Sequence, residues 1–201
     1  MKSLVVIALL AVACTAAFAG PVNMQFNGAS GYNSNGEYTY PYGFTVSGQQ
    51  ANLMCISLNN EITPGETWKA NVATVASLWG TQNANLYDQA AWLLLQENSS
   101  GFDPAINWVV WSLFAPSVDL SPIPNAGNWL TAAQGQTFHA GEFSNVFVYT
   151  PVDGTQSWGG TPQTFLGYNT PTPEPGSLML MGSGILGLAG VLRRKVAAMR
   201  G

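Results

Sequence analysis

The chain has 201 residues, six Lys and Arg, ten Asp and Glu, and a formal net charge of −4. Five of the six basic residues lie near the two ends, so Lys69 is the single basic side chain of the long central part, which holds nine acidic residues and a net charge near −8. This balance argues against nucleic acid and against an anionic membrane surface as partners of the central part.

The first 19 residues have the three parts of a bacterial secretory signal peptide. Lys2 supplies the positive start, residues 4–13 are apolar, and Ala17 and Ala19 supply the small residues of a cleavage site. We therefore expect export, with cleavage just after Ala19. An alternative interpretation uses Cys14 as a lipidated cysteine, although the residue three positions before it is not the usual leucine.

The first third of the central part predicts β-strands. Residues 25–26 open one strand, and 28–36 form a loop with the turn signal Asn35-Gly36. Aromatic and apolar residues alternate with smaller ones over 38–46, which predicts a half-buried strand that Pro41 interrupts or places at an edge. Residues 51–58 form a short apolar run typical of a buried strand.

The middle of the chain predicts helices. Thr63, Pro64 and Glu66 resemble a helix start, and apolar residues then recur at helical spacing as far as Trp79. Stronger helical patterns cover 86–97 and 104–114, the second with Asp103 as its cap, and 129–134 adds a last turn.

Two further strands are predicted, over 145–150 and 162–168. The order of strands, helices and strands indicates an α+β fold, in which a helical insertion of about three helices packs on a β-sandwich or barrel-like body. We expect this body to span residues 20–169, followed by a proline-rich linker over 170–175 and a separate C-terminal transmembrane helix.

The sequence offers no pattern that is typical of an enzyme. His139 is the only histidine and no Cys or Asp cluster flanks it, as a metal site would need. Neither a glycine-rich phosphate loop nor a Gly-x-Ser-x-Gly motif is present. Asp103, Asp119 and Asp153 each stand at a predicted cap or turn. We therefore predict a body without catalytic activity, cofactor or metal.

The C-terminal segment joins three blocks without a gap. The first is Pro173-Glu174-Pro175, the second is an uncharged apolar run over 178–192, and the third is the basic group Arg193-Arg194-Lys195. A helix over 176–195 with its basic end in the cytoplasm would span a membrane if the arginines reach the interface.

These three blocks closely resemble the PEP-CTERM sorting signal of exported bacterial proteins, here over 172–196. The resemblance implies that an exosortase, a membrane-embedded cysteine transpeptidase, cuts near Pro173-Glu174-Pro175 and leaves the helix and basic tail behind. The protein would then be anchored in the inner membrane until it is processed, and would afterwards belong to the cell surface or the extracellular matrix. The alternative is an ordinary C-terminal anchor after a proline-rich linker.

The segment from Cys55 to Phe114 distantly resembles the thioester domains of surface adhesins. In that family a cysteine on a strand bonds to a glutamine four residues before a helical tryptophan. Here Cys55 is the matching possible reactive thiol and Asn107, four residues before Trp111, is the partner position. Asparagine is one methylene shorter, so we expect the scaffold without the bond. A covalent adhesin and a domain that binds extracellular polysaccharide are the two alternatives to a structural role.

Overall fold

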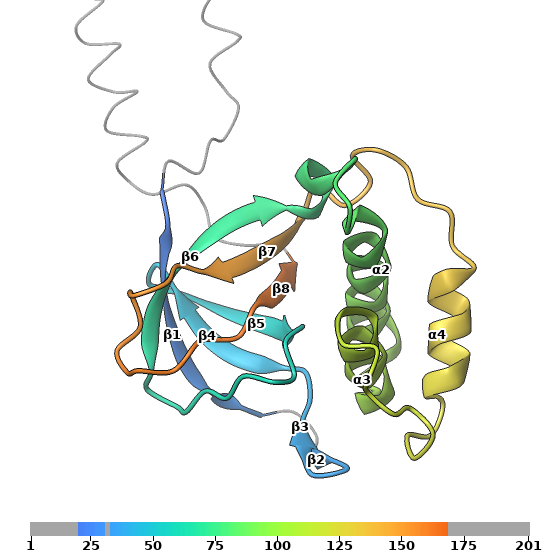
Figure 1. Cartoon of the computed structure of the whole chain (residues 1–201), viewed down its shortest axis with the longest axis horizontal. Helices are drawn as coiled ribbons and strands as arrows, with labels where there is room; N and C mark the ends of the chain where they lie inside the picture. The colour runs from blue at the N-terminus through green and yellow to red at the C-terminus, as the bar shows by residue number, and fades with distance from the viewer. Residues whose placement is uncertain (1–19, 31–32, 169–201) are drawn as a thin grey trace, which may run out of the picture. The chain divides into compact units, whose positions relative to one another are not determined.

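A closed six-stranded barrel is the first of two layers in the computed structural model, which describes residues 20–30 and 33–168 (Figure 1). Its strands are β1 (Val22–Ala29), β4 (Tyr42–Val46), β5 (Gln49–Cys55), β6 (Thr67–Thr74), β7 (Val146–Pro151) and β8 (Phe165–Tyr168). They follow one another around the barrel in the order β1-β4-β5-β8-β7-β6, and every neighbouring pair is antiparallel. The predicted barrel-like body is confirmed.

The inside of the barrel is filled with aromatic side chains. Along β1, Val22, Met24 and Phe26 are buried and the residues between them are exposed, because successive side chains of a strand point to opposite faces. Phe44 lies at the centre of this inner core, with its ring centroid 4.7 Å from that of Phe165 and 5.7 Å from that of Trp68. Rings of this size remove much apolar surface from water when the barrel closes, and this burial stabilises the closed barrel.

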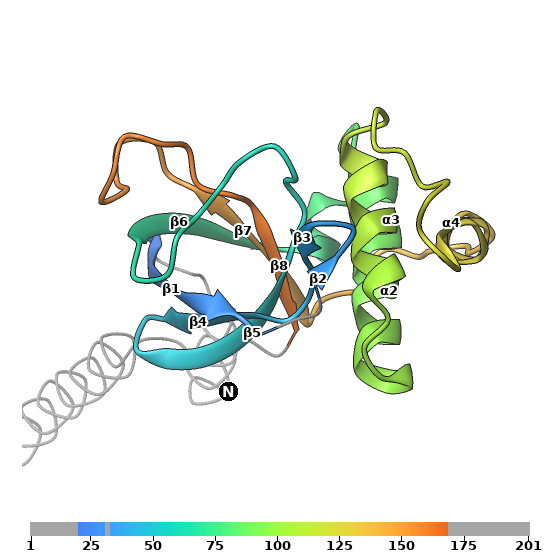
Figure 2. The ribbon, with the colours of Figure 1, turned by 90° about the horizontal axis from the view of Figure 1, so that it is seen from below.

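Three helices and a 3-10 turn lie between β6 and β7 and form a layer beside the barrel (Figures 1 and 2). They are η1 (Val75–Leu78), α2 (Ala84–Ser100), α3 (Pro104–Phe114) and α4 (Ala126–Gln134). The predicted helices over 86–97 and 104–114 are confirmed, and α4 begins three residues before the predicted 129–134. Asp103 caps α3 as predicted, since its Oδ1 accepts a hydrogen bond from the backbone N–H of Ala105 at 3.0 Å.

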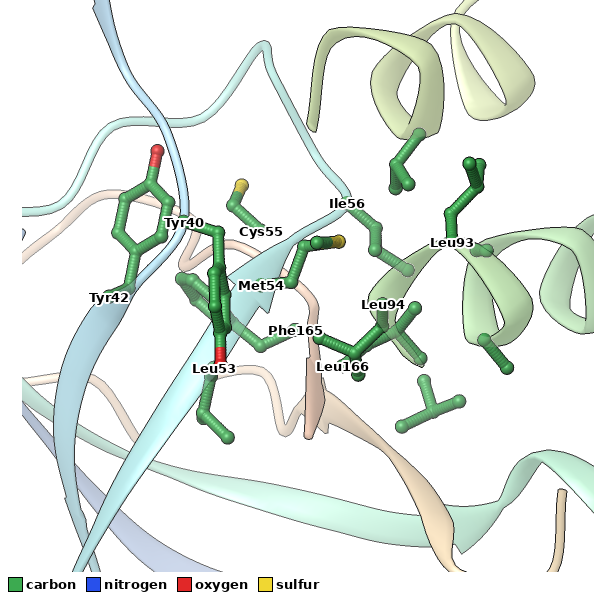
Figure 3. Packing of buried hydrophobic residues seen from close by; sticks show 14 of the residues in the cluster. Tyr40, Tyr42, Leu53, Met54, Cys55, Ile56, Leu93, Leu94, Phe165 and Leu166 are labelled. Atoms are coloured by element: carbon green, nitrogen blue, oxygen red, sulfur yellow. The ribbon is translucent and has the colours of Figure 1, made fainter. Parts of the chain in front are cut away.

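The helical layer covers part of the outer face of the barrel. Met54 of β5 pairs with Leu166 of β8, and their side chains point toward Leu93 and Leu94 of α2 (Figure 3). Leu53, Met54 and Cys55 are consecutive and all 0% exposed, because one face of β5 lines the barrel and the other lies under the helices. A continuous buried run of this kind is typical of a strand that is covered on both faces.

The predicted helix over 63–79 is wrong, because residues 67–74 form the strand β6. Gly65 has a φ of +95°, and the Glu66 N–H donates to the Thr63 carbonyl at 3.1 Å, so Pro64-Gly65 forms a turn. The Glu66 carboxylate does accept the bond from the Thr63 N–H that a helix start would have, at 2.8 Å. Hydrogen bonding to β1 on one side and to β7 on the other then favours the strand.

A small hairpin replaces part of the loop that we predicted over 28–36. It consists of β2 (Asn33–Ser34) and β3 (Glu37–Tyr38), joined at Asn35-Gly36, where both residues have positive φ angles of 52° and 92°. This is the turn that an Asn-Gly pair favours. The strand predicted over 38–46 is divided at Pro41 into β3 and β4, so Pro41 interrupts it as expected.

The two terminal segments fall outside the described residues. This applies to the predicted signal peptide with Ala17 and Ala19, to the sorting motif and to the predicted transmembrane helix over 176–195. Over residues 20–30 and 33–168, none of the helices has the length and apolar character needed to cross a membrane.

Candidate functional site

Cys55 lies at the end of β5, where the barrel meets the helical layer. Its side chain is 0% exposed, and its Sγ lies 3.4 Å from the Ser57 carbonyl oxygen, to which the thiol donates. Burial raises the pKa of the Cys55 thiol to about 12. Because the thiolate is the reactive form of cysteine, a thiol in this environment is a poor nucleophile at neutral pH.

Asn107 of α3 lies directly against the end of β5. Its side chain is 0% exposed, and its Nδ2 donates to the Cys55 carbonyl oxygen at 2.9 Å. Its Oδ1 accepts from the backbone N–H of Tyr40, also at 2.9 Å. The structure therefore brings Cys55 and Asn107 together, as the resemblance to thioester domains led us to expect, but the amide bonds to main-chain groups. In this arrangement Asn107 links α3 to β5 and to the segment before β4.

Tryptophans surround this link on the helical side. Trp111, one turn after Asn107, is 1% exposed and lies beside the Cys55 thiol. Its ring packs edge to face on Trp108, with the centroids 5.1 Å apart. Edge-to-face packing of this kind stabilises a core beyond the area that it buries.

We expect Cys55 to be a free and unreactive thiol in the folded protein. The chain without residues 1–19 should have the mass of its sequence, with no loss of ammonia, and iodoacetamide should modify its one thiol, Cys55, only after unfolding, because burial excludes the reagent. Intact mass spectrometry before and after denaturation measures both, with Cys55→Ala as the unlabelled control. A chain that lacks one ammonia and resists alkylation in denaturant would instead contain the thioester.

The other predicted polar residues hold local structure. The backbone N–H of His139 donates to the Glu142 carboxylate at 3.0 Å in an exposed loop. Asp119 accepts from both the N–H and the hydroxyl of Ser121, which lowers the pKa of its carboxyl group. Within the part of the chain that the structure describes, no three His, Cys, Asp or Glu side chains are placed to hold a metal ion.

Sequence reasoning missed one buried acid, Glu97 of α2, which is 1% exposed. Glu97 is the last residue of the predicted helix over 86–97. Its spacing from Leu93 and Leu94, four and three residues earlier, places it on the same helix face as these two buried leucines. That spacing is the signal that could have identified it.

The comparison with protein families gives a match at the C-terminus. Residues 171–195 match the family model described as the PEP-CTERM protein-sorting motif. No curated protein and no solved structure is significantly similar to the chain. The matched range includes Pro173-Glu174-Pro175 and the basic group from Arg193 to Lys195.

The protein therefore carries a PEP-CTERM sorting motif, and this motif indicates an exported protein that is sorted by an exosortase. The motif implies association with the membrane through the C-terminus before processing. It does not describe the barrel or the helical layer, which lie outside the matched range.

Proposed function

We propose that the protein is a non-enzymatic structural or binding component of the bacterial envelope or extracellular matrix. The observation that carries this proposal is the sorting motif over 171–195, which follows closely after β8, the strand that ends at Tyr168. The signal peptide would direct export through the inner membrane, the helix over 176–195 would hold the chain there, and the exosortase would release the body by cutting near Pro173-Glu174-Pro175.

The body supports a non-enzymatic role because three polar residues named from the sequence have structural partners. Asn107 links backbone groups in the core, and Asp103 and Asp119 hold local turns and caps. A barrel filled by rings such as Phe44 and Phe165 suits a durable extracellular domain.

A binding role would use the aromatic rings that the body exposes. These are Tyr38 at 55%, Trp79 at 48%, Phe102 at 48% and Tyr168 at 39% exposure. Exposed large apolar side chains often mark interaction sites, and flat rings can stack on sugar faces. The polysaccharide-binding alternative rests on these rings and stays a prediction.

Replacing Pro173, Glu174 and Pro175 by alanine should stop processing while leaving the body folded. The uncut chain should then accumulate in the membrane fraction, since the helix over 176–195 is retained. Cell fractionation with immunoblotting of the body measures both location and size. The matched control replaces Asn169 and Thr170, which lie outside the matched range.

The control should be processed as the natural chain is. Identical size and location of the natural and the triple-alanine chains would contradict the sorting proposal. In that case the tail would be an ordinary anchor.

A further inference from the structure

Glu97 places a carboxyl group inside the helical layer. The residue is 1% exposed, and its Oε2 accepts a hydrogen bond from the backbone N–H of Asp103 at 2.8 Å. Its Oε1 is buried and has no hydrogen-bond partner among the described residues. A buried charge without full pairing costs a large free energy, so a carboxyl group in this position favours its neutral form.

Within residues 20–30 and 33–168, no lysine or arginine lies beside Glu97 to compensate a charge on it. The sequences of α3, α4 and η1, which pack with α2, contain no ionisable residue, and β8 contributes only the phenol of Tyr168. On α2 itself, Tyr87 and Asp88 stand near the opposite end. Lys69, the single lysine or arginine in the described ranges, is exposed on β6. The charged group that faces Glu97 is Asp103, which has the same sign.

Burial, together with the neighbouring Asp103 carboxylate, raises the pKa of Glu97 from 4.5 to about 7. The hydrogen bond from the Asp103 N–H opposes this rise. Glu97 would therefore change its charge close to neutral pH, far above the range in which an exposed glutamate does so.

Glu97 lies where the three helices α2, α3 and α4 are connected to one another through Asp103, a place that we call the joint. Gly101, with a φ of 88°, ends α2, and Asp103 starts α3 two residues later. The Asp103 carboxylate caps α3 through Oδ1 and accepts from the Trp129 Nε1–H of α4 through Oδ2 at 2.8 Å. The backbone of the same residue bonds to Glu97. Asp103 therefore connects α2, α3 and α4, and Glu97 holds Asp103.

We propose that Glu97 is a proton switch in the joint between α2, α3 and α4. The protonated carboxyl group keeps the joint closed, and release of its proton to solvent places a second negative charge beside Asp103 and loosens the joint. The helical layer is then tightest in acidic surroundings and opens locally above neutral pH, while the barrel stays closed.

The sign of the effect on stability follows from the raised pKa of Glu97. The folded state holds the proton more tightly than the unfolded state, so the stabilisation is complete below pH 4.5 and is lost as the pH rises through about 7. Burial also raises the pKa of Asp88, with Glu142 adding to it, so part of the pH dependence belongs to that group. The difference between the natural chain and Glu97→Gln isolates the contribution of Glu97.

The test is hydrogen exchange of the full-length chain in detergent at pH 5 and pH 8, corrected for intrinsic exchange rates. We expect the opening equilibrium of the amides over 97–106 to rise roughly tenfold or more between these pH values, while the amides of β1 and β4 change little. The Glu97→Gln variant should remove the rise, because its amide stays uncharged. Glu61→Gln, which changes an exposed loop residue, should keep it.

Carbon-13 NMR titration of the side-chain carboxyl groups provides a measurement on the natural chain, independent of whether Glu97→Gln folds. We expect one glutamate to titrate near pH 7. A Glu97 that titrates below pH 5, or a pH-dependent rise that survives in a folded Glu97→Gln chain, would overturn the proposal.

Discussion

Replacing Asn107 by leucine is expected to lower the free energy of unfolding by about 2–6 kcal/mol. Leucine has a similar volume but no polar atoms, so the substitution removes the acceptor of the Tyr40 N–H and the donor to the Cys55 carbonyl in a site that is 0% exposed. Each buried polar group that loses its partner costs about 1–3 kcal/mol. Urea unfolding, followed by tryptophan fluorescence, measures the change.

The matched control is Asn52→Leu, which makes the same chemical change at an exposed position of β5. It should alter the free energy of unfolding by no more than about 0.5 kcal/mol, as surface substitutions generally do. If Asn107→Leu lowered the free energy of unfolding as little as Asn52→Leu does, Asn107 would not be the structural link between α3 and the barrel that we infer.

Replacing Phe44 by alanine should cost about 3–5 kcal/mol, because it removes a ring from the centre of a packed core and leaves a cavity. Phe44 is 0% exposed and its ring contacts Phe26, Trp68 and Phe165. Chemical denaturation gives the magnitude, and near-UV circular dichroism should show weaker signals from the aromatic rings that lose their contacts.

Tyr38→Ala serves as the control for this substitution, since it also removes an aromatic ring but from a site that is 55% exposed. Its effect should stay within about 0.5 kcal/mol. A Phe44→Ala chain as stable as the Tyr38→Ala chain would mean that the inner aromatic core does not hold the barrel closed.

Local patterns predicted most elements of the body. The alternation over 38–46, the Ala- and Leu-rich pattern over 86–97 and the Asp103-Pro104 start each reflect interactions within a few residues. The structure confirms both helices, and it confirms the strand over Tyr42–Val46, after the interruption at Pro41. The prediction of a helix over 63–79 was wrong because it too used only interactions within a few residues. The bond between the Glu66 carboxylate and the Thr63 N–H occurs in the turn before β6 as it would at a helix start, so it could not distinguish the two.

Closure of the barrel could not be predicted, because it depends on pairs that are distant in sequence. Cys55 lies opposite Phe165, and Val22 lies opposite Ala70, and no local signal specifies either register. This is why the sequence left a sandwich and a barrel equally open. The pairing also decides which strand face meets the helices, and with it the burial of Met54 and Leu166.

The candidate sites also differed in whether they depend on neighbouring residues or on residues that are distant in sequence. The sorting motif is read from contiguous residues and needs no fold, so the sequence located it almost to the residue. Cys55 and Asn107 are 52 residues apart, and only a resemblance placed them together. The role of Glu97 depends on an absence of cations around a helix face, which becomes visible only when α3 and α4 are in place.

The end of β8 limits the length of chain between the folded body and the proposed cut site near Pro173. The strand ends at Tyr168 and Pro173 follows only five residues later. Even a fully extended chain covers at most ~3.6 Å per residue, so at most about 18 Å of chain separates Tyr168 from a cut at Pro173. An enzyme embedded in the membrane would therefore have to accept the folded barrel at its entrance. The bulk and curvature of the cargo, as well as the short motif, would then decide which exported chains it can process.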